Sequence, residues 1–593
     1  MKRILFLMLL PFTVAQAQVT IAPAFPERGQ TVTVTYNPDG KGIPADAAEV
    51  TLVFPYSTFY DVPYRIKMKA QNGVWTTSFK LARYATFASF YLQSGEAVNR
   101  PAPDELYEVC VYKDKVPVCN AELHRAYSLG SAMGKSPQLG ARQEEQYRKE
   151  LKRYPDNYEA KVRLLAYQMN KAKTPKEKAK FRAEAHRVIA DKFKTAATVP
   201  GDMNKVTMGY LIIGENSRLD SIRAVALERY PHTGLGRDLL TSAIAREKDT
   251  AKQIARYEAA LKEENRENAA DFDGMHERLF ALYAARKDSA KALYHARFFS
   301  FPKDDSPYYP EKLKDIAQAL LDNGIALDTA RMFASRSLAM AERFPVGIIR
   351  YFPETGYIYP YATDSARQVV YNTAKGNLHS MLALIDMKQG KDAAAAKRME
   401  QAIKSSIDKE TVDNATLFYS ATGRTRELQE LEALRERDMQ ARIAKQEIRK
   451  PAPPLNTFVD MNGRPLDPAS LKGKIVVIDF WATWCIPCMQ EMPYLQKLYD
   501  QYRNDPDVAF MIVNSGARNT LADAQGWSGN KKYTFPVYYN TDPAIGDKFK
   551  FTVIPATYVI DKSGHIRFGN IGFEGPDVEM KLRLQIEMAR NKE

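Results

Sequence analysis

The chain has 593 residues, of which 45% are hydrophobic and 26% are charged. Hydrophobic cores stop growing near about 250 to 300 residues, so this length excludes a single-domain protein, and the composition excludes a disordered or multi-span membrane chain. The 85 Lys and Arg residues outnumber the 71 Asp and Glu residues and give a net charge of +14. These charges are interspersed along stretches of helical composition. We therefore expect solvated helix faces and no nucleic-acid partner, with an acidic partner or an anionic envelope surface as the alternative.

The N-terminus carries the three-part pattern of a secretory signal peptide. Lys2 and Arg3 precede an apolar run over residues 4–10, and Ala15-Gln16-Ala17 forms a small-residue cleavage site. The alternative of a membrane anchor needs about 20 apolar residues, and this run is much shorter. The pattern predicts a signal peptide at residues 1–17, a protein exported to the periplasm or cell envelope, and no transmembrane span after cleavage.

Residues 18–130 alternate apolar and polar positions in short runs. Residues 31–36 and 49–54 are two such runs, and Asn37-Pro38-Asp39-Gly40 is a turn signal between them. This pattern predicts a small antiparallel β-sandwich of the Ig-like type. Its acids, histidines and hydroxyls do not recur at a spacing useful for catalysis, so we expect a role in interaction or spacing.

Two of the four cysteines, Cys110 and Cys119, lie in this first region. If Asp114 and Lys115 form a two-residue turn, the cysteines face each other across a hairpin. In an oxidising compartment they can form a structural disulfide. The alternative is two half-buried strand cysteines that never pair, and the sequence leaves both interpretations open.

From 138 to 445 the hydrophobic pattern has a helical period. One segment resembles a tetratricopeptide repeat, and its matching residues are Leu382, Ala383, Gly390, Ala395 and Ala402. An Arg-aromatic-Pro sequence also recurs at 153–155, 229–231 and 343–345. We expect an all-α helical repeat of the tetratricopeptide type, with an irregular helical bundle as the alternative.

A charged helix over residues 425–449 leads into Pro451, Pro453 and Pro454. Because proline cannot continue a helix, this segment predicts a domain boundary, with the last domain at 446–593.

The last domain contains the residue pattern that carries chemistry. A continuous apolar run at 474–480 predicts a buried strand, Cys485 and Cys488 follow, and residues 489–502 have helical composition. Two thiols separated by two residues at a helix start can close a small disulfide, and the helix dipole favours the thiolate of the first. A zinc site would need further ligands, and neither a second such pair nor nearby histidines are present. We therefore expect no metal.

Further motifs extend this pattern through most of the last domain. They are Gly473-Lys474, Asp479 to Cys485, Pro487-Cys488, Glu491, Pro493, Ile554-Pro555-Ala556-Thr557 and Ile560 to Ile566. With these residues the region resembles the thioredoxin superfamily, specifically exported proteins of the TlpA/ResA type, which are related to the AhpC/TSA proteins. The resemblance implies an α/β thioredoxin fold and a thiol–disulfide oxidoreductase with no cofactor beyond its redox-active disulfide.

The resemblance also implies a role for each matching residue. Cys485 is the expected attacking thiolate and Cys488 the resolving thiol. Asp479 is the expected buried carboxylate that exchanges a proton with Cys488, and burial should raise its pKa; the alternative is an Asp that only accepts hydrogen bonds. Glu491 is expected either in the same relay, or in substrate discrimination, or as a solvated helix residue.

Four more residues are expected to bind substrate. Pro555 matches the family's cis-proline, which places the backbone of Ile554 beside the disulfide for pairing with an extended substrate. Pro487 suits an early helix position. Trp484 is expected either to flank the site as an apolar contact or merely to pack. The Ile486-Pro487 dipeptide departs from the Gly-Pro of cytoplasmic thioredoxins, so the reduction potential of those proteins is not assigned to this chain.

Three functions are compatible with these features. The first is reduction of disulfides in envelope proteins, with electrons from a membrane donor of unknown identity. The second is an envelope adaptor in which the redox domain is accessory. The third is a thiol peroxidase, which the position of Thr483, two residues before Cys485, disfavours. The direction of electron flow is not determined by the sequence.

Overall fold

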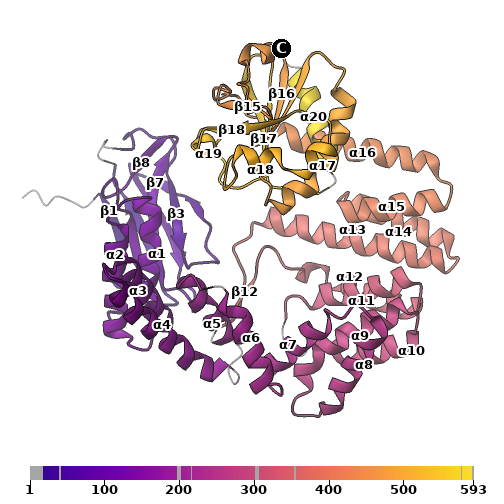
Figure 1. Cartoon of the computed structure of the whole chain (residues 1–593), viewed down its shortest axis with the longest axis horizontal. Coiled ribbons are helices and arrows are strands. Elements are labelled where there is room, and N and C mark those ends of the chain that lie inside the picture. Colours follow the sequence, from indigo (N-terminus) through magenta and orange to yellow (C-terminus); the bar gives the residue numbers. More distant parts are fainter. Residues whose placement is uncertain are drawn as a thin grey trace, which may run out of the picture. The chain divides into compact units, whose positions relative to one another are not determined.

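The computed structural model describes residues 18–590, apart from 39, 41, 197–201, 216, 301–305, 353, 354 and 576. The chain separates into two compact units, Met1–Phe418 and Tyr419–Glu593. The predicted signal peptide at 1–17 lies outside the described residues. Figure 1 shows strands at the start of the first unit, helices through the rest of it, and a mixed sheet in the second unit. Over the described residues, no helix combines the length and apolarity needed to cross a membrane.

The first unit begins with two antiparallel sheets that share a core. Their strand orders are β1-β2-β6-β5 and β4-β3-β7-β8, and β9 also pairs with β7. The strands are β1 (Val19–Ala22), β2 (Thr31–Tyr36), β3 (Thr51–Ser57), β4 (Arg65–Lys67), β5 (Lys69–Gln71), β6 (Val74–Lys80), β7 (Phe87–Ser94), β8 (Ala97–Asn99), β9 (Tyr107–Cys110), β10 (Tyr112–Lys113) and β11 (Val116–Pro117). Alternate residues of a strand point to one face, so Val32 and Val34 of β2 are buried with Phe54 and Phe90 of the other sheet. The predicted N-terminal sheets are confirmed, while the Ig-like arrangement stays a prediction.

The two cysteines of this region do not form the disulfide that the sequence allowed. Asp114 and Lys115 do make the two-residue turn of a β10–β11 hairpin, with φ of 51° and 62°. However, Cys110 ends β9, which pairs with β7, and Cys119 lies in the turn that leads into the first helix. Asn120 adopts a left-handed φ of 73° there. Because the chain leaves the hairpin before Cys119 enters a strand, both thiols are free.

Helices make up most of the remaining first unit. They are α1 (Ala121–Met133), α2 (Leu139–Arg153), α3 (Tyr158–Lys171), α4 (Pro175–Ala196), α5 (Asp202–Ile212), α6 (Arg218–Arg229), α7 (Gly234–Ile244), α8 (Thr250–Ala260), α9 (Asp273–Ala285), α10 (Ser289–Phe299), α11 (Tyr309–Asn323), α12 (Leu327–Ala339), α13 (Asp364–Lys388), α14 (Asp392–Ser405) and α15 (Lys409–Ala421). Short 3-10 turns are η1 (Leu261–Glu263), η2 (Ala269–Phe272) and η3 (Ala341–Arg343), and β12 (Arg350–Phe352) pairs with β13 (Gly356–Ile358). The predicted helical content is confirmed. The β12–β13 pair was not predicted.

The repeat-like residues occupy one helix pair. Leu382 and Ala383 are buried on α13, and Ala395 and Ala402 are buried on α14. Gly390 lies between these helices at a φ of 71°, which glycine adopts without strain. Each recurring Arg-aromatic-Pro sequence starts at the last residue of α2, α6 or η3, so its proline lies just beyond the end of the element, where it cannot continue a helix. Assignment to the tetratricopeptide family stays a prediction.

The second unit contains a seven-stranded sheet of order β14-β20-β19-β16-β17-β18-β15. Its strands are β14 (Lys450–Pro451), β15 (Phe458–Asp460), β16 (Ile475–Trp481), β17 (Val508–Asn514), β18 (Val537–Asn540), β19 (Ala556–Ile560) and β20 (His565–Ile571). Its helices are α16 (Thr425–Ala444), α17 (Ile486–Tyr502), α18 (Leu521–Gln525), α19 (Ile545–Phe549) and α20 (Val578–Arg590), with 3-10 turns η4 (Pro468–Leu471) and η5 (Ser528–Lys531). β16 is parallel to β17 and antiparallel to β19.

The fully buried central strand β16 separates two cores. Ile475, Val477 and Trp481 pack with residues of α17 and α20, whereas Val476 and Phe480 pack on the other face. Strand alternation therefore directs the intervening Asp479 toward the α17 side. The buried strand and following helix predicted from the sequence are confirmed.

The second unit includes the charged helix α16 that precedes the proline-rich segment. Met439 and Ile443 of α16 belong to the core on the α17 side, and Glu447 forms an ion pair with Arg567 of β20. The two compact units divide at Phe418/Tyr419, because this charged helix buries its few apolar residues against the sheet unit, while the domain boundary at 445/446 stays a prediction.

Candidate active site

Cys485 and Cys488 lie where β16 gives way to α17. Cys485 is the N-cap residue of α17, and Pro487 occupies an early position of the first turn, where its missing N–H leaves no hydrogen bond unmade. The two cysteines are joined by a disulfide, with their Cα atoms 5.3 Å apart. The structure thus brings together the two sulfurs predicted from the sequence.

The helix start favours a negative charge on Cys485. The Cys488 N–H donates to the Cys485 sulfur at 3.2 Å, in the geometry of an N-cap hydrogen bond. The 17-residue helix also directs the positive end of its dipole at this position. When the disulfide is reduced, both effects stabilise a thiolate on Cys485. Cys485 is only 3% exposed and Cys488 is fully buried, so Cys485 is the sulfur that a partner can reach.

The Ile554-Pro555 peptide bond is cis, and it lies beside the disulfide. The Ile554 carbonyl oxygen is 3.6 Å from the Cys485 sulfur. Pro555 immediately precedes β19, the neighbour of β16. The backbone of Ile554 is thus placed next to the reactive sulfur, as the sequence resemblance implied.

Three exposed apolar side chains flank the two motifs of the site, two beside Cys485 and one before Ile554. Trp484 is 48% exposed, Ile486 is 71% exposed, and Val553 is 57% exposed. The Trp484 ring is fixed, since its Nε1–H donates to the Ala517 carbonyl oxygen at 2.8 Å. Arg518 also lies 5.6 Å from the ring centroid. Val553 was not singled out from the sequence, although its place before the Ile554-Pro555 motif is a usable signal.

Asp479 and Glu491 are buried carboxyl groups on the α17 side of the sheet. Thr557 stands opposite Asp479 in the β16–β19 register, and its Oγ1 donates to Asp479 Oδ1 at 3.0 Å. Asp479 Oδ2 and Glu491 Oε2 have no hydrogen-bond partner among the described residues. Burial raises the pKa of Asp479, and burial together with the charge of Asp479 raises the pKa of Glu491. At least one carboxyl of this pair therefore holds a proton near neutral pH.

Thr557 is a member of the site that sequence reasoning did not assign a role. It was visible in the Ile554-Pro555-Ala556-Thr557 motif, but only the strand register reveals that it faces Asp479. Its hydrogen bond lowers the pKa of Asp479, against the effect of burial. Within the described part of the chain, no cluster of three or more His, Cys, Asp or Glu residues is suited to hold a metal ion.

The arrangement can perform two-electron thiol–disulfide exchange. It combines a reachable sulfur at a helix start, a second sulfur that can displace the first partner, and carboxyl groups able to hold a proton near pH 7.

Comparison with known proteins gives matches in the same region. The model of the AhpC/TSA family matches residues 448–568. Thiol-disulfide oxidoreductase ResA of Oceanobacillus iheyensis is 36% identical over 98 residues, which cover 16% of this chain and 50% of the relative. ResA of Bacillus cereus is 31% identical over 122 residues, covering 21% of this chain and 68% of the relative. ResA of Bacillus subtilis is 31% identical over 107 residues, covering 18% and 58%. The chain thus spans half to about two thirds of these curated relatives.

Solved structures match as well. A thiol:disulfide interchange protein from Chlorobium tepidum is 26% identical, and the alignment covers 24% of this chain and 97% of that chain with a TM-score of 0.20. StoA from Bacillus subtilis is 21% identical, with coverage of 22% and 99% and a TM-score of 0.20.

Proposed function

Because the chain belongs to the AhpC/TSA family of thioredoxin-like proteins, we propose that this thiol–disulfide oxidoreductase reduces disulfides of exported proteins. The observation that carries the proposal is the Cys485–Cys488 disulfide at the start of α17, with Cys485 beside the Ile554 carbonyl oxygen. An envelope adaptor with an accessory redox domain is not favoured, since the named relatives are oxidoreductases.

The proposed reaction starts from the reduced pair. The Cys485 thiolate attacks one sulfur of a substrate disulfide, the substrate S–S bond breaks, and the other substrate sulfur leaves as a thiolate. Cys488 then loses its proton and attacks Cys485, which releases the second substrate thiolate and closes the Cys485–Cys488 disulfide. Two electrons pass to the substrate, and two protons convert its thiolates into thiols.

The buried carboxyls of Asp479 and Glu491 have a defined task in this reaction. Cys488 is fully buried, and a thiol in apolar surroundings does not ionise readily near pH 7. A carboxylate with a raised pKa is a suitable base for its proton, because a raised pKa brings the carboxyl close to the working pH. We assign this task to the pair of Asp479 and Glu491.

The partners follow from the same scheme. A dithiol reductant must reduce the oxidised Cys485–Cys488 pair again after each reaction. The described part of the chain offers no second Cys-x-x-Cys pair for this, since Cys110 and Cys119 are free thiols separated by eight residues. The pattern at 1–17 supports export to the periplasm or envelope. A membrane electron donor and disulfide-containing envelope proteins are therefore the proposed partners, with no cofactor beyond the redox-active disulfide.

A trapping experiment tests the proposal. In cells, Cys488→Ser should accumulate mixed disulfides through Cys485, and reducing agent should release the captured proteins. The matched control, Cys485→Ser combined with Cys488→Ser, should capture none. Equal capture by both variants would contradict the mechanism. If the captured proteins become more oxidised in a strain that lacks this chain, the direction is reduction; if they become more reduced, the proposed direction is wrong.

A further inference from the structure

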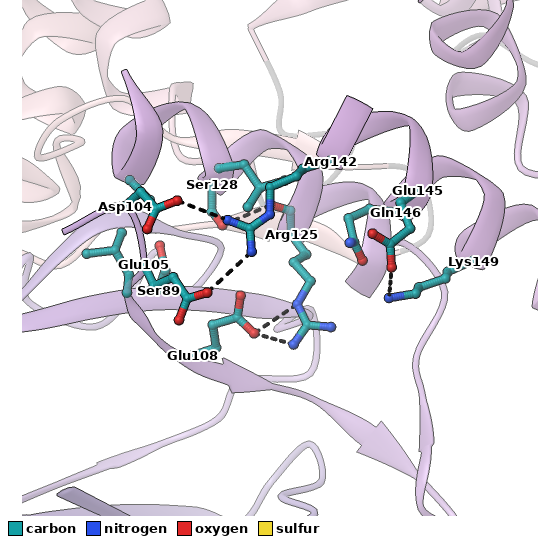
Figure 2. Close-up of a pocket in the computed structure, with 13 residues that line it drawn as sticks. Ser89, Asp104, Glu105, Glu108, Arg125, Ser128, Arg142, Glu145, Gln146 and Lys149 are labelled. Carbon is teal, nitrogen blue, oxygen red and sulfur yellow. Dashed lines mark hydrogen bonds and ion pairs between the residues drawn. The ribbon is translucent and has the colours of Figure 1, made fainter. Parts of the chain in front are cut away.

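The first unit contains a polar pocket that has no part in the redox chemistry. It has a volume of about 330 Å³, in the lower range of small-molecule sites. Ser89 of β7 and Glu108 of β9 stand opposite each other in the sheet and form one wall. Arg125 and Ser128 of α1 form a second wall, and α2 contributes Gln146 to a third. Figure 2 shows these side chains around the pocket, with Arg125 between Ser89 of the sheet and Gln146 of α2.

The cations of the pocket are already neutralised by its own acids. Arg125 Nε donates to Glu108 Oε2 at 2.8 Å. Arg142 is 3.4 Å from Asp104 Oδ2 and 3.3 Å from Glu105 Oε1, and Lys149 is 2.7 Å from Glu145 Oε1. Figure 2 marks these ion pairs. A negatively charged ligand would have to displace a carboxylate from one of these pairs, and each of the four lining carboxylates already contacts a cation, so the pocket is better matched to an uncharged molecule.

Two buried polar atoms in the pocket lining lack a partner. Ser89 Oγ and Gln146 Oε1 make no hydrogen bond among the described residues. Ser89 is 1% exposed and Gln146 is 8% exposed, so neither side chain lies in open solvent. A buried polar group without a partner costs about 1–3 kcal/mol, and such groups are rare in native proteins. These two atoms need a group that donates a hydrogen bond to Gln146 and exchanges one with Ser89.

We infer that this pocket binds an uncharged polyhydroxylated molecule of one or two sugar rings. A sugar hydroxyl both donates and accepts, so different hydroxyls of one molecule can serve Ser89 and Gln146 and also contact the carboxylate and guanidinium groups. Leu106, Leu129 and Ala132 provide apolar contacts for the C–H face of a ring. The first unit thereby gains a binding role that is separate from the disulfide of the second unit.

Isothermal titration of the full chain with maltose, cellobiose and N,N′-diacetylchitobiose tests the inference. At least one of the three should bind saturably, and Ser89→Ala and Gln146→Met should each weaken that binding about tenfold, the effect of losing about 1.4 kcal/mol. Gln138→Met is the matched control, because Gln138 precedes α2 and does not line the pocket. It should leave the affinity unchanged.

Stability measurements separate a binding role from a structural one. Ser89→Ala removes an unpartnered buried hydroxyl, so the melting temperature of the free variant should equal or exceed that of the parent chain. The inference is overturned if none of the three sugars binds, if binding is the same in Ser89→Ala and Gln146→Met as in the parent, or if inorganic phosphate or glycine binds more tightly than the sugars in a Ser89-dependent manner.

Discussion

Thr557→Val is the sharpest test of the proposed proton transfer. The substitution keeps the shape of a fully packed side chain but removes the hydroxyl that donates to Asp479 Oδ1 at 3.0 Å. Asp479 Oδ2 has no hydrogen-bond partner among the described residues, so the Thr557 bond to Oδ1 is the main local stabilisation of this carboxylate. Its loss should raise the pKa of Asp479, because the bond lowers that pKa in the parent chain.

The size of the effect follows from the strength of the bond. A hydrogen bond to a charged group contributes about 1.5–3 kcal/mol, and one pKa unit corresponds to about 1.4 kcal/mol. The pKa of the carboxyl should therefore rise by about one to two units. If the carboxylate form accepts the Cys488 proton, the variant holds less carboxylate than the parent at a given pH. At pH values below the carboxyl pKa of both proteins, resolution of the mixed disulfide should therefore be about tenfold to a hundredfold slower in the variant.

Stopped-flow measurement of mixed-disulfide resolution between pH 5 and pH 9 reads this change. The midpoint of the Thr557→Val profile should move toward alkaline pH by about one to two units. Thr541→Val is the matched control, because the exposed Thr541 hydroxyl only donates to the Thr457 carbonyl oxygen. Superimposable profiles for Thr557→Val and the parent chain would refute the role of the carboxyl pair.

Three further changes have defined outcomes. Folding raises the pKa of Glu491 to about 9, so the folded chain binds more protons than the unfolded chain between about pH 4.3 and that pKa. The stability of the parent chain therefore falls as the pH rises between these two values. Glu491→Gln removes this loss, so its melting temperature should rise relative to that of the parent from pH 5 to pH 8. Trp484→Ala should raise KM for a peptide disulfide about fivefold or more without lowering the melting temperature, because Trp484 is half exposed. Ile443→Ala should lower the unfolding free energy of the second unit by about 2–5 kcal/mol, read by near-UV circular dichroism in urea; no loss would contradict the placement of α16 in that core.

The redox centre could be predicted because its signals are local. An unbroken apolar run, two cysteines at fixed spacing and a helical segment follow one another between residues 474 and 502, and each has a short-range physical reason. The partnership of Thr557 with Asp479 could not be predicted in this way. It depends on the register of two strands whose paired residues are 78 positions apart.

Long-range contacts also explain the differences in the fold. α16 has charged residues on most of its surface, so its sequence resembles a linker helix, and only the structure shows Met439 and Ile443 in the core. Similarly, Cys119 was expected in a strand, but Asn120 turns the chain into α1 instead. The pocket near Ser89 is built from segments that lie as far apart as β7 and α2, and no single segment carries its pattern.

The near-complete burial of Cys485 limits when the disulfide of a substrate protein can be reduced. Only a narrow, locally straightened stretch of chain can bring a cystine to a sulfur that is 3% exposed. For the exported substrates proposed above, cystines enclosed in a finished fold could not approach it, whereas those of newly secreted or unfolded chains could. Under the proposed function, selectivity would then depend on how quickly each client completes its folding, with little need to read its amino-acid sequence.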